Sequence, residues 1–484
     1  MTLDRLAARL CRRTASDPQH RDIRDAARRL GVRVWLVGGA VRDAALGRPA
    51  SDLDLAAAAG ARRLARTLAS AWGHRGFRFE KRGVTTFRFA VAGRAVDIVD
   101  AGARGIERDL LRRDFTMNAI AFDLVDGSVL DPLHGLRDIA ARRLRLPRPG
   151  VVREDPVRAL RACRFLAELP EFRLDPAAKR EAAKAARALR RASVERIAEE
   201  IDKLLATPRP DRGLDAVERL GLLPAVLPEL QPLRGCVAGE GRPSVWRHTL
   251  DALALAARPR RVPGSAAARD PGAARLLRWT LLVHDLSKPE TLSRREDGRP
   301  AFHGHEVLGA RRAETLLHRL KLPKAFRRRV SQLVRCHLRP HHLADAGPTD
   351  RGLKRLVRDA GEDLPVLVLH AACDALASGS PDARARWRRL RPVLLRLLAL
   401  HGTAASEPLP VLVTGTDVMF VLGIGPGPDV GQALREIREM QEDGAIASRE
   451  QAIAHLAALR GRSAAVSAGG PKRRGSGAPR TSRA

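Results

Sequence analysis

Residues 36–55, LVGGAVRDAALGRPASDLDL, hold the signals from which the architecture of the N-terminal part can be derived. The apolar run 34–37 predicts a short strand, which Gly38 and Gly39 bring to an end. Residues 40–46 then predict a helix, and the free amides at its N-terminus can face an anion. Because glycine has no Cβ, the turn lets a phosphate group approach the backbone closely. The run therefore predicts a phosphate-binding turn.

The same run ends in two carboxylates that alternate with leucines. Residues 51–55, SDLDL, predict a second strand. Because side chains alternate across a strand, Asp52 and Asp54 point to one face while the leucines point into the core. Arg42, in the first turn of the preceding helix, can bind phosphate oxygens through forked hydrogen bonds. Two carboxylates on one face predict a divalent-metal site beside the phosphate-binding turn.

A third carboxylate follows in a later strand pattern. In the run RAVDIV, Asp97 faces the opposite side from Val96 and Ile98, because side chains alternate. Asp97 can therefore join Asp52 and Asp54 if its strand lies beside theirs. We expect these three aspartates to be the catalytic carboxylates.

Strand patterns are concentrated in the first third of the chain. Residues 85–91 and 94–99 predict two strands joined by a glycine turn, and residues 120–124 and 128–130 predict another pair. From Pro156 onward, long Ala-, Leu- and Arg-rich segments with helical periodicity dominate. The sequence predicts an α+β head with a mixed sheet, followed by an all-α neck, a helical body and a helical tail.

The composition predicts a globular protein of several domains. The chain has 484 residues, of which 44% are hydrophobic, enough for about three separate cores. Its apolar runs are shorter than the roughly 18 residues that cross a membrane, and its first residues lack an apolar signal core. Five scattered cysteines without a Cys-x-x-Cys pair argue against a disulfide framework and against a thiolate zinc site. We expect a cytoplasmic protein that does not enter a membrane.

The net charge of +33 favours a polyanionic partner, for which nucleic acid is the obvious candidate. Arginine greatly outnumbers lysine, alanine is abundant and tyrosine is absent, a bias that a GC-rich genome can impose on any protein. The charge therefore supports an RNA partner without establishing one. With only 3% aromatic residues, the chain offers few platforms on which single-stranded bases could stack.

The succession of strand, Gly-Gly turn, helix with arginine and acidic strand resembles the signature of the template-independent RNA nucleotidyltransferases of the polymerase-beta superfamily. It is most similar to the bacterial class that contains CCA-adding tRNA nucleotidyltransferases and poly(A) polymerases. A second element, RRDFTMNA at residues 112–119, closely matches another signature of this class. The resemblance implies a polymerase-beta-like head. It also places Arg113 on the triphosphate, with Asp114 and Asn118 around the nucleotide and its sugar.

A third element, EDPVRALRACRF at residues 154–165, resembles the part of the family that selects the nucleotide. In the family, a carboxylate and an arginine here hydrogen-bond to the Watson–Crick edge of CTP or ATP, and by position these are Asp155 and Arg158. Arg161 and Arg164 follow in steps of three along one helix face and would serve nucleotide binding. A charged, solvated helix face is the alternative interpretation.

The resemblance implies two-metal chemistry in the head. Divalent cations held by Asp52 and Asp54 would activate the RNA 3′-hydroxyl and stabilise the departing pyrophosphate. Hard oxygen ligands favour Mg²⁺. The predicted nucleotide-binding residues are Gly38, Gly39, Arg42, Arg113, Asp114, Asn118, Asp155, Arg158, Arg161 and Arg164.

Histidines and aspartates in the helical body form a second constellation. It resembles the metal-dependent phosphohydrolase superfamily named for its His-Asp pair, the HD superfamily, which some CCA-adding enzymes contain. The predicted metal ligands are His248, His284, Asp285 and Asp374. Imidazole and carboxylate together suit a transition metal that activates water. Ser287 stands where glycine is usual and basic residues crowd the site, so a structural or RNA-docking remnant is the alternative.

Together these patterns predict five segments. They are a nucleotidyltransferase head at 25–147, a helical neck with the nucleotide-recognition helix and an RNA-binding surface at 148–210, a helical HD-type domain at 211–400, a helical tail at 401–462 and a disordered basic tail at 463–484.

The function implied is that of an enzyme, a CCA-adding tRNA nucleotidyltransferase. It would use CTP and ATP to extend the 3′ end of tRNA, or of another RNA, and would release pyrophosphate. Poly(A) polymerase, CC-only and A-only activities remain open, because Asp155 and Arg158 suit either base. An HD-type phosphohydrolase with an RNA-binding head is the alternative from another class. The sequence leaves the oligomeric state open.

Overall fold

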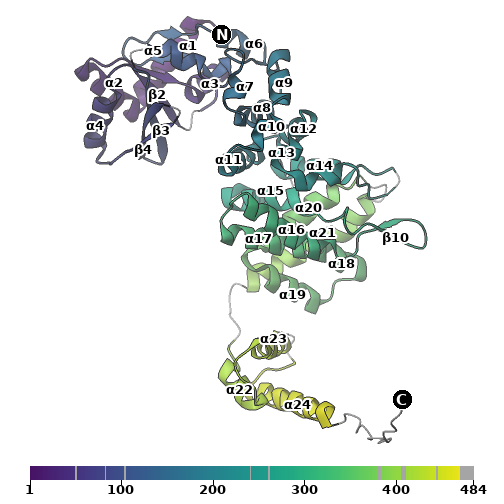
Figure 1. Cartoon of the computed structure of the whole chain (residues 1–484). Helices are drawn as coiled ribbons and strands as arrows, with labels where there is room; N and C mark the ends of the chain where they lie inside the picture. The colour runs from purple at the N-terminus through teal and green to yellow at the C-terminus, as the bar shows by residue number, and fades with distance from the viewer. Residues whose placement is uncertain are drawn as a thin grey trace, which may run out of the picture. The chain divides into compact units, whose positions relative to one another are not determined.

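The computed structural model describes residues 1–468 apart from the gaps 50–51, 82, 103–104, 240, 260–261, 380–382, 405–409 and 443–444. The chain folds into two compact units (Figure 1). The first unit consists of Met1–Leu338 and Pro365–Arg388, and the second consists of Arg339–Leu364 and Arg389–Ala484. The predicted helical body is therefore divided between the two units.

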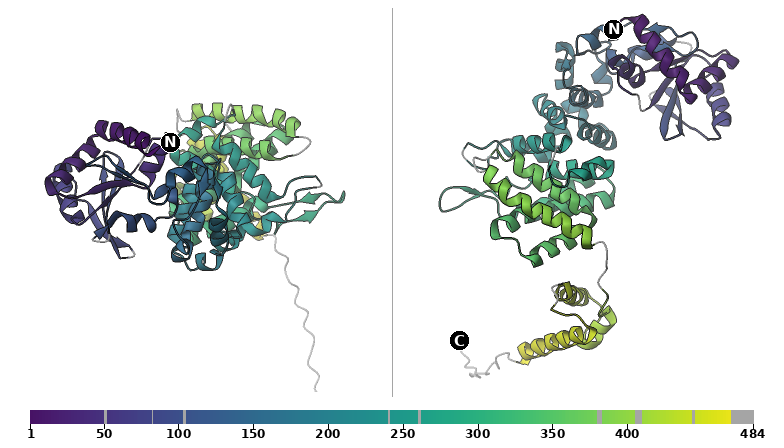
Figure 2. Two further views of the ribbon diagram at one scale, coloured as in Figure 1. Left: turned by 90° about the horizontal axis from the view of Figure 1, so that it is seen from above. Right: turned by 180° about the vertical axis from the view of Figure 1, so that it is seen from behind.

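The head of the first unit is built on a seven-stranded mixed sheet (Figures 1 and 2). Its strand order is β3-β4-β5-β2-β1-β6-β7, with β2 and β5 parallel and the other neighbours antiparallel. The strands are β1 (Val34–Val37), β2 (Leu53–Ala57), β3 (Phe77–Lys81), β4 (Val84–Val91), β5 (Arg94–Asp100), β6 (Ala121–Asp123) and β7 (Val129–Leu130). The predicted mixed sheet is confirmed, and the strands expected to carry the catalytic residues lie at its centre.

The region around the Gly-Gly turn follows the predicted pattern with one difference. Strand β1 has the predicted bounds and all four of its residues are buried, and helix α3 spans Gly39–Leu46. Strand β2, in contrast, begins at Leu53 and not at the predicted residue 51, and its pairing with β1 begins one residue later, at Asp54. Asp52 lies in an exposed bend just before β2, and Ser51 lies outside the described residues.

Helices that the sequence analysis did not predict also belong to the head. These are α1 (Leu3–Ser16) and α2 (Pro18–Leu30). Helix α1 contacts α3 and β7, and α2 contacts α4 (Ala61–Trp72), which itself packs on β4 and β5. The head therefore extends to the N-terminal side of its predicted start at residue 25. Helix α5 (Gly105–Leu111) contacts β2 and leads into the RRDFTMNA element.

Helices make up most of the remaining first unit, as predicted. In chain order they are α6 (Gly135–Ala140), α7 (Val151–Glu154), α8 (Val157–Glu168), α9 (Pro176–Ala183), α10 (Ala186–Leu189), α11 (Val194–Leu205), α12 (Pro210–Arg219), α13 (Leu223–Val226), α14 (Val245–Ala257), α15 (Pro271–Val283), α16 (His305–Arg319), α17 (Lys324–Cys336) and α20 (Leu364–Ala377). Helix α8 packs against α11 and α12, and α15 packs against α14 and α17.

Two short strand pairs lie outside the seven-stranded sheet. The pair β8 (Arg143–Leu144) and β9 (Arg173–Leu174) is parallel, and the pair β10 (Ser293–Arg294) and β11 (Pro300–Ala301) is antiparallel. Each strand has only two residues, too few to produce a recognisable alternation of polar and apolar side chains. The sequence therefore gives no signal for them.

A buried carboxylate fixes the RRDFTMNA element to the chain that follows it. Asp138 in α6 is fully buried and accepts hydrogen bonds from Thr116 Oγ1 at 2.7 Å and Arg145 Nε at 2.8 Å. Its other oxygen accepts a hydrogen bond from Arg143 Nη2 at 2.6 Å. A buried carboxylate is stable only with such partners, so these contacts hold residues 112–119 in one position.

The second unit contains α18 (Arg339–Ala346), α19 (Asp350–Ala360), most of α21 (Ala383–Ala404), α22 (Gly415–Leu422), α23 (Pro428–Glu442) and α24 (Arg449–Ala468). Val418, Ile437 and Leu456 lie in the buried core that α22, α23 and α24 share. Of the predicted tail 463–484, residues 469–484 lie outside the described part, and α24 continues to Ala468. Within the described residues, every helix is too short or too polar to cross a bilayer.

Candidate active site

The Gly-Gly turn lies directly beneath two charged groups. Gly38 has a φ of +70°, which favours glycine. A Cβ at this position would lie 2.7 Å from Arg113 Nη1 and 2.8 Å from Asp54 Oδ2. A Cβ on Gly39, in contrast, would approach only Arg42 Nη2, at 3.8 Å. The turn therefore needs glycine at position 38 for two reasons, the positive φ and the absence of a Cβ. Arg113 and Asp54 both lie against this glycine.

Two of the three predicted catalytic carboxylates, Asp54 and Asp97, lie side by side at the centre of the sheet. Strands β2 and β5 are parallel neighbours in which Asp54 stands opposite Asp97, as the sequence analysis required. Burial raises the pKa of Asp54, and the negative charges of Asp97 and Asp52 raise it further, against the opposing charge of Arg113. Because these carboxylates repel one another, the site fits a divalent cation, which would offset the repulsion.

Arginines balance part of this negative charge. Arg88 on β4 lies opposite Asp97, and its Nε donates to Asp97 Oδ1 at 2.6 Å. Arg113 Nη2 donates to Asp109 at 2.8 Å, which holds the side chain in place while its Nη1 lies near Gly38. Arg113 therefore lies beside the glycine turn, and its contact with a triphosphate stays a prediction.

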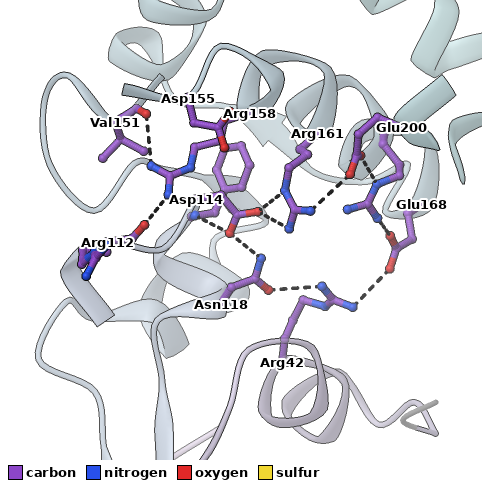
Figure 3. Close-up of polar contacts among 12 residues, drawn as sticks. Arg42, Arg112, Asp114, Asn118, Val151, Asp155, Arg158, Arg161, Glu168 and Glu200 are labelled. Carbon is purple, nitrogen blue, oxygen red and sulfur yellow. Dashed lines mark hydrogen bonds and ion pairs between the residues drawn. The ribbon is translucent and has the colours of Figure 1, made fainter. Parts of the chain in front are cut away.

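A closed ring of ion pairs and hydrogen bonds joins the head to the neck (Figure 3). It connects α3, the RRDFTMNA element, α8 and α11, and every link is between 2.6 and 3.3 Å long. In order around the ring, the residues are Asp114, Arg161, Glu200, Arg164, Glu168, Arg42 and Asn118, which returns to Asp114. We call this set the head–neck ring.

Asp114 is the most highly bonded member of the head–neck ring. Its carboxylate accepts hydrogen bonds from Arg161, from the Asn118 side chain at 2.9 Å and from the Phe115 amide at 2.9 Å. Although burial alone would raise its pKa, Arg161 and these hydrogen bonds hold the pKa of Asp114 well below its usual range. Asp114 is therefore a permanent anion around which the neighbouring groups are ordered.

The head–neck ring occupies three arginines for which we predicted direct contact with the nucleotide. Arg42 donates to Asp43, Asn118 and Glu168, and its guanidinium is buried. Arg161 and Arg164 are each bound by two carboxylates. In this structure the three guanidinium groups bind protein carboxylates and position α3 and α8. Their contact with a nucleotide stays a prediction.

The two predicted base-reading residues lie at the beginning of α8. Asp155 follows α7 and accepts a hydrogen bond from Arg196 of α11 at 2.7 Å. Arg158 donates to the Val151 carbonyl at 3.1 Å and also to the Arg112 carbonyl, both of which Figure 3 shows. Arg158 thus contacts the backbone next to Arg113, so the structure brings the base-reading and triphosphate-binding candidates close together.

Several participating residues were not predicted from the sequence, among them Glu168 and Glu200. Glu200 is only 5% exposed and lies on the face of α11 that buries Ile197 and Ile201. A charged residue at a core position of an amphipathic helix needs a buried partner. The position of Glu200 on the apolar face of α11 could therefore have indicated a buried ion pair. The residues around Glu168 give no comparable indication.

The structure brings together the four residues of the second constellation, His248, His284, Asp285 and Asp374, here called the HD centre. His248 Nε2 lies 2.8 Å from Asp374 Oδ1, and His284 Nε2 lies 3.2 Å from Asp285 Oδ2 and 3.4 Å from Asp374 Oδ1. Asp285 and His284 are buried. The four side chains therefore lie close together, and their role as metal ligands stays a prediction.

The orientation of the imidazoles fits a metal ion at the HD centre. His248 Nδ1 and His284 Nδ1 each bond to a backbone carbonyl, of Ala377 and Leu281 respectively. With each Nδ1 bonded to a carbonyl, each Nε2 faces carboxylate oxygens, an arrangement that a proton on Nε2 or a metal cation between the groups would satisfy. Although burial alone would lower it, the Asp285 and Asp374 charges raise the pKa of His284 to about 10.

Comparisons with known proteins match this architecture along the chain. A family model of the poly(A) polymerase head domain matches residues 34–145. A model described as a probable RNA and SrmB-binding site of polymerase A matches residues 171–233, and an HD domain model matches residues 245–379.

Curated relatives cover nearly the whole chain. An A-adding tRNA nucleotidyltransferase of Deinococcus radiodurans is 36% identical over 87% of this chain and 94% of its own length. A CC-adding tRNA nucleotidyltransferase of Thermus thermophilus is 35% identical over 90% of this chain and 95% of its own length. A multifunctional CCA protein of Xanthomonas campestris is 34% identical over 84% of this chain and 97% of its own length.

Solved structures show the same fold. The Bacillus stearothermophilus CCA-adding enzyme in complex with CTP has a TM-score of 0.61 and 25% identity, over 93% of this chain and all of that one. The Thermotoga maritima CCA-adding enzyme complexed with tRNA has a TM-score of 0.57 and 17% identity, over 95% of this chain and 98% of that one. The chain belongs to the family of bacterial tRNA nucleotidyltransferases and poly(A) polymerases, with an HD domain behind its head and neck.

Proposed function

We propose that this protein extends the 3′ end of tRNA with nucleotides from CTP and ATP, without a nucleic-acid template, and that its product is the CCA end. The observation that carries the proposal is the convergence of Asp54, Asp97 and Arg113 at the Gly38 turn. Carboxylates next to a guanidinium suit a metal-bound triphosphate, because cations need anionic oxygen ligands and phosphates need positive charge. The named relatives support the same class of reaction.

In this proposal, Asp52 and Asp54 hold the divalent cations, and Mg²⁺ is the expected metal because the ligands are carboxylate oxygens. When bound, such cations activate the RNA 3′-hydroxyl and stabilise the leaving pyrophosphate. Arg113 and the N-terminal amides of α3 bind the triphosphate and orient its α-phosphorus for in-line attack. The bond from the RNA 3′-oxygen to phosphorus forms as the bond to pyrophosphate breaks. No protein nucleophile takes part.

Selection of the base is assigned to Asp155 and Arg158. The Asp155 carboxylate accepts hydrogen bonds and the Arg158 guanidinium donates them. Together they can therefore pair with both the donors and the acceptors on the Watson–Crick edge of cytosine or adenine. Arg196 restrains Asp155, and the Arg112 carbonyl restrains Arg158, which limits the positions that either side chain can take. Side chains held in fixed positions can distinguish one base from another, whereas mobile charged side chains would attract any nucleotide.

The experiment that tests the proposal is sequencing of the 3′ ends formed on tRNA that lacks its terminal CCA. The purified protein is incubated with Mg²⁺ and with CTP, ATP or both. Addition of CCA with both nucleotides, and of CC with CTP alone, supports the proposal. Products limited to CC or to A identify a partial enzyme, and a long A tract identifies a poly(A) polymerase. If no 3′ extension occurs with either nucleotide, the proposal is wrong.

A second candidate activity, metal-dependent phosphohydrolysis at the HD centre, is favoured by the cluster of imidazoles around Asp285. A transition metal is proposed there because imidazole ligands prefer such cations to Mg²⁺. Replacing Asp52 and Asp54 with alanine is expected to abolish nucleotide addition and preserve hydrolysis of a phosphomonoester or cyclic nucleotide. Replacing His284 and Asp285 is expected to have the opposite effect. A head variant that loses both activities would contradict this division.

We also propose that the protein acts in the cytoplasm, where its RNA substrate is found. The five cysteines support a reducing compartment, since all are free thiols and four of them are buried. We assign nucleotide transfer to the head, which extends from α1 to residue 147. We assign nucleotide selection and RNA binding to the neck at 148–210, hydrolysis to the HD-type domain at 211–400 and support of the RNA to the tail at 401–462.

A further inference from the structure

A row of four side chains crosses the head sheet from the candidate metal site to the edge of the sheet. Asp54 on β2 stands opposite Asp97 on β5. Asp97 stands opposite Arg88 on β4, and Arg88 in turn stands opposite Phe77 on β3. Because directly opposite residues of neighbouring strands project to the same face, all four side chains share one face of the sheet. We call this set the transverse row.

The face that carries the transverse row is the more exposed face of the sheet. On β5, Val96 and Ile98 point to the opposite face and are fully buried, whereas Asp97 is only partly buried. The side chain of Arg88 is 45% exposed, and Phe77 is 58% exposed. Strand β3 comes first in the strand order, so Phe77 lies at an edge of the sheet (Figure 1). The row therefore runs from the centre of the sheet to an edge that is open to solvent.

Phe77 is one of two neighbouring rings at this edge. Phe79 projects to the same face two residues later, and the two ring centroids are 5.8 Å apart with the planes inclined by 34°. The guanidinium of Arg88 lies over the Phe79 ring, 5.4 Å from its centroid, while its Nε donates to Asp97. The ring and the carboxylate together restrain this guanidinium. The two rings and the guanidinium therefore form one surface of flat groups.

The core of the head gains little from Phe77, because more than half of this residue is exposed. Exposed apolar side chains on an edge strand also invite pairing with other chains. Arg75 and Arg78, which flank Phe77 in the chain, are both exposed. Every base has a flat face that can stack on an aromatic ring, and phosphates pair with guanidinium groups. Rings flanked by arginines therefore suit single-stranded nucleic acid better than an apolar protein surface.

We propose that Phe77 and Phe79 form a stacking platform for the unpaired 3′ end of the RNA substrate. The proposal rests on the proposed function, in which the reacting 3′-hydroxyl lies at Asp54 and Asp97. Three strand spacings separate β2 from β3, which places Phe77 roughly 14 Å from Asp54. This distance corresponds to a few nucleotides. The platform therefore holds the bases that precede the reacting nucleotide, and Arg88 lies beside the phosphates that join them.

The test compares two RNA hairpins with the same stem, one with a blunt end and one with a few unpaired 3′ nucleotides. Their affinities for the full chain are measured without CTP or ATP, so that binding is observed whether or not transfer can follow. Phe77→Ala should weaken binding of the unpaired end about tenfold, as expected for the loss of base stacking, and leave binding of the blunt hairpin unchanged.

Three further variants separate stacking from other effects. Phe77→Leu keeps an apolar side chain without a ring and should bind as weakly as Phe77→Ala. Phe77→Trp keeps a ring and should retain the native affinity. Leu292→Ala removes an equally exposed apolar side chain just before β10, far from the head in sequence, and should also retain it.

Steady-state kinetics provide a second measurement. In Phe77→Ala the KM for RNA should rise by about the same factor as the loss of affinity, while the KM for CTP stays unchanged, because the ring is assigned to the RNA alone. A rise in both KM values would overturn the proposal, since it would show a general disturbance of the head.

Other results would overturn the stacking platform as well. These are equal weakening of both hairpins in Phe77→Ala, native affinity in Phe77→Leu, or a native dimer that Phe77→Ala dissociates, which would identify β3 as an edge for self-association. Binding of the unpaired end that depends on Phe77, without any 3′ extension, would contradict the proposed function and support the platform. Normal 3′ extension by Phe77→Ala at every RNA concentration would do the reverse.

Discussion

Asp114 and Arg161 form a forked ion pair, in which Arg161 Nε and Nη2 lie 2.7 and 2.6 Å from the same carboxylate oxygen. Asp114 belongs to the RRDFTMNA element of the head, and Arg161 belongs to α8 of the neck. This pair is the shortest link of the head–neck ring. It therefore fixes the distance between the RRDFTMNA element and α8, the two parts of the proposed active site that would bind the nucleotide.

The first prediction concerns this forked pair. Arg161→Lys removes the fork and leaves Asp114 and Glu200 sharing one flexible ammonium, so we expect a loss of about 1 to 3 kcal/mol in the free energy of unfolding. The KM for CTP should rise as well, because the two parts of the site lose their fixed separation. Thermal unfolding and steady-state kinetics measure both. Arg180→Lys, an exposed change on α9, is the control, and equal stability of the two variants would refute the argument.

The second prediction concerns the glycine turn. Gly38→Ala forces an alanine into a left-handed conformation and sets its Cβ 2.7 Å from Arg113 Nη1, so kcat/KM should fall at least about tenfold. Gly73→Ala, after α4, is the matched control, since its φ of +63° is similar and its Cβ would meet nothing within 4 Å. We expect Gly73→Ala to keep most of the activity. Equal losses in the two variants would show that the close approach at Gly38 does not matter.

The third prediction concerns the pH dependence of stability at Asp54. Burial, together with Asp97 and Asp52, raises the pKa of this carboxyl in the folded state, so the folded protein binds its proton more tightly than the unfolded chain does. The stability that Asp54 contributes therefore falls as the pH rises through the raised pKa. Asp54→Asn should raise Tm at neutral pH, and the gain should vanish as the pH drops below the pKa of an unfolded aspartate, about 3.9.

Added Mg²⁺ provides the control for this effect. It should raise the Tm of the native protein at neutral pH and leave the Tm of Asp54→Asn almost unchanged, because the variant has lost a cation ligand. Nucleotide addition by the variant should be lost. A variant that is less stable than the native protein at neutral pH would show that Asp54 is stabilised by Arg113 more than it is destabilised by burial.

The fourth prediction concerns nucleotide selection. Arg196→Ala removes the hydrogen bond that restrains Asp155, so we expect a weaker preference for CTP and ATP over UTP and GTP. A loss of about 1 kcal/mol in discrimination would reduce the preference about fivefold, measured as the ratio of kcat/KM values. Arg190→Ala, an exposed change before α11, should leave the ratio intact. An unchanged ratio in Arg196→Ala would mean that Asp155 does not need this restraint.

The sequence predicted the centre of the head well because its signals are local. The Gly-Gly break, the alternation around Asp54 and the alternation around Asp97 each follow from a few adjacent residues, and the register of β2 with β5 then brought the aspartates together. Helices α1 and α2 were not predicted although both are amphipathic, because they precede the strand pattern that marks the head.

The partners of the site residues could not be predicted in the same way. Glu200 is 39 residues from Arg161, and Glu168 is 126 residues from Arg42, so their pairing depends on how the helices pack. His305 and His337 are likewise brought to Asp285 by the packing of α15 with α17 and of α16 with α17. Periodicity shows which face of a helix is buried, but it does not show which charges will meet there.

The head–neck ring also has a consequence for how the proposed RNA substrate is attracted. Its three arginines face three carboxylates, so the ring is electrically neutral and adds nothing to the net charge of +33. The long-range field that draws RNA to the protein therefore comes from other arginines and lysines. Raising the salt concentration should weaken RNA capture, whereas the partly buried ring should keep the nucleotide site assembled.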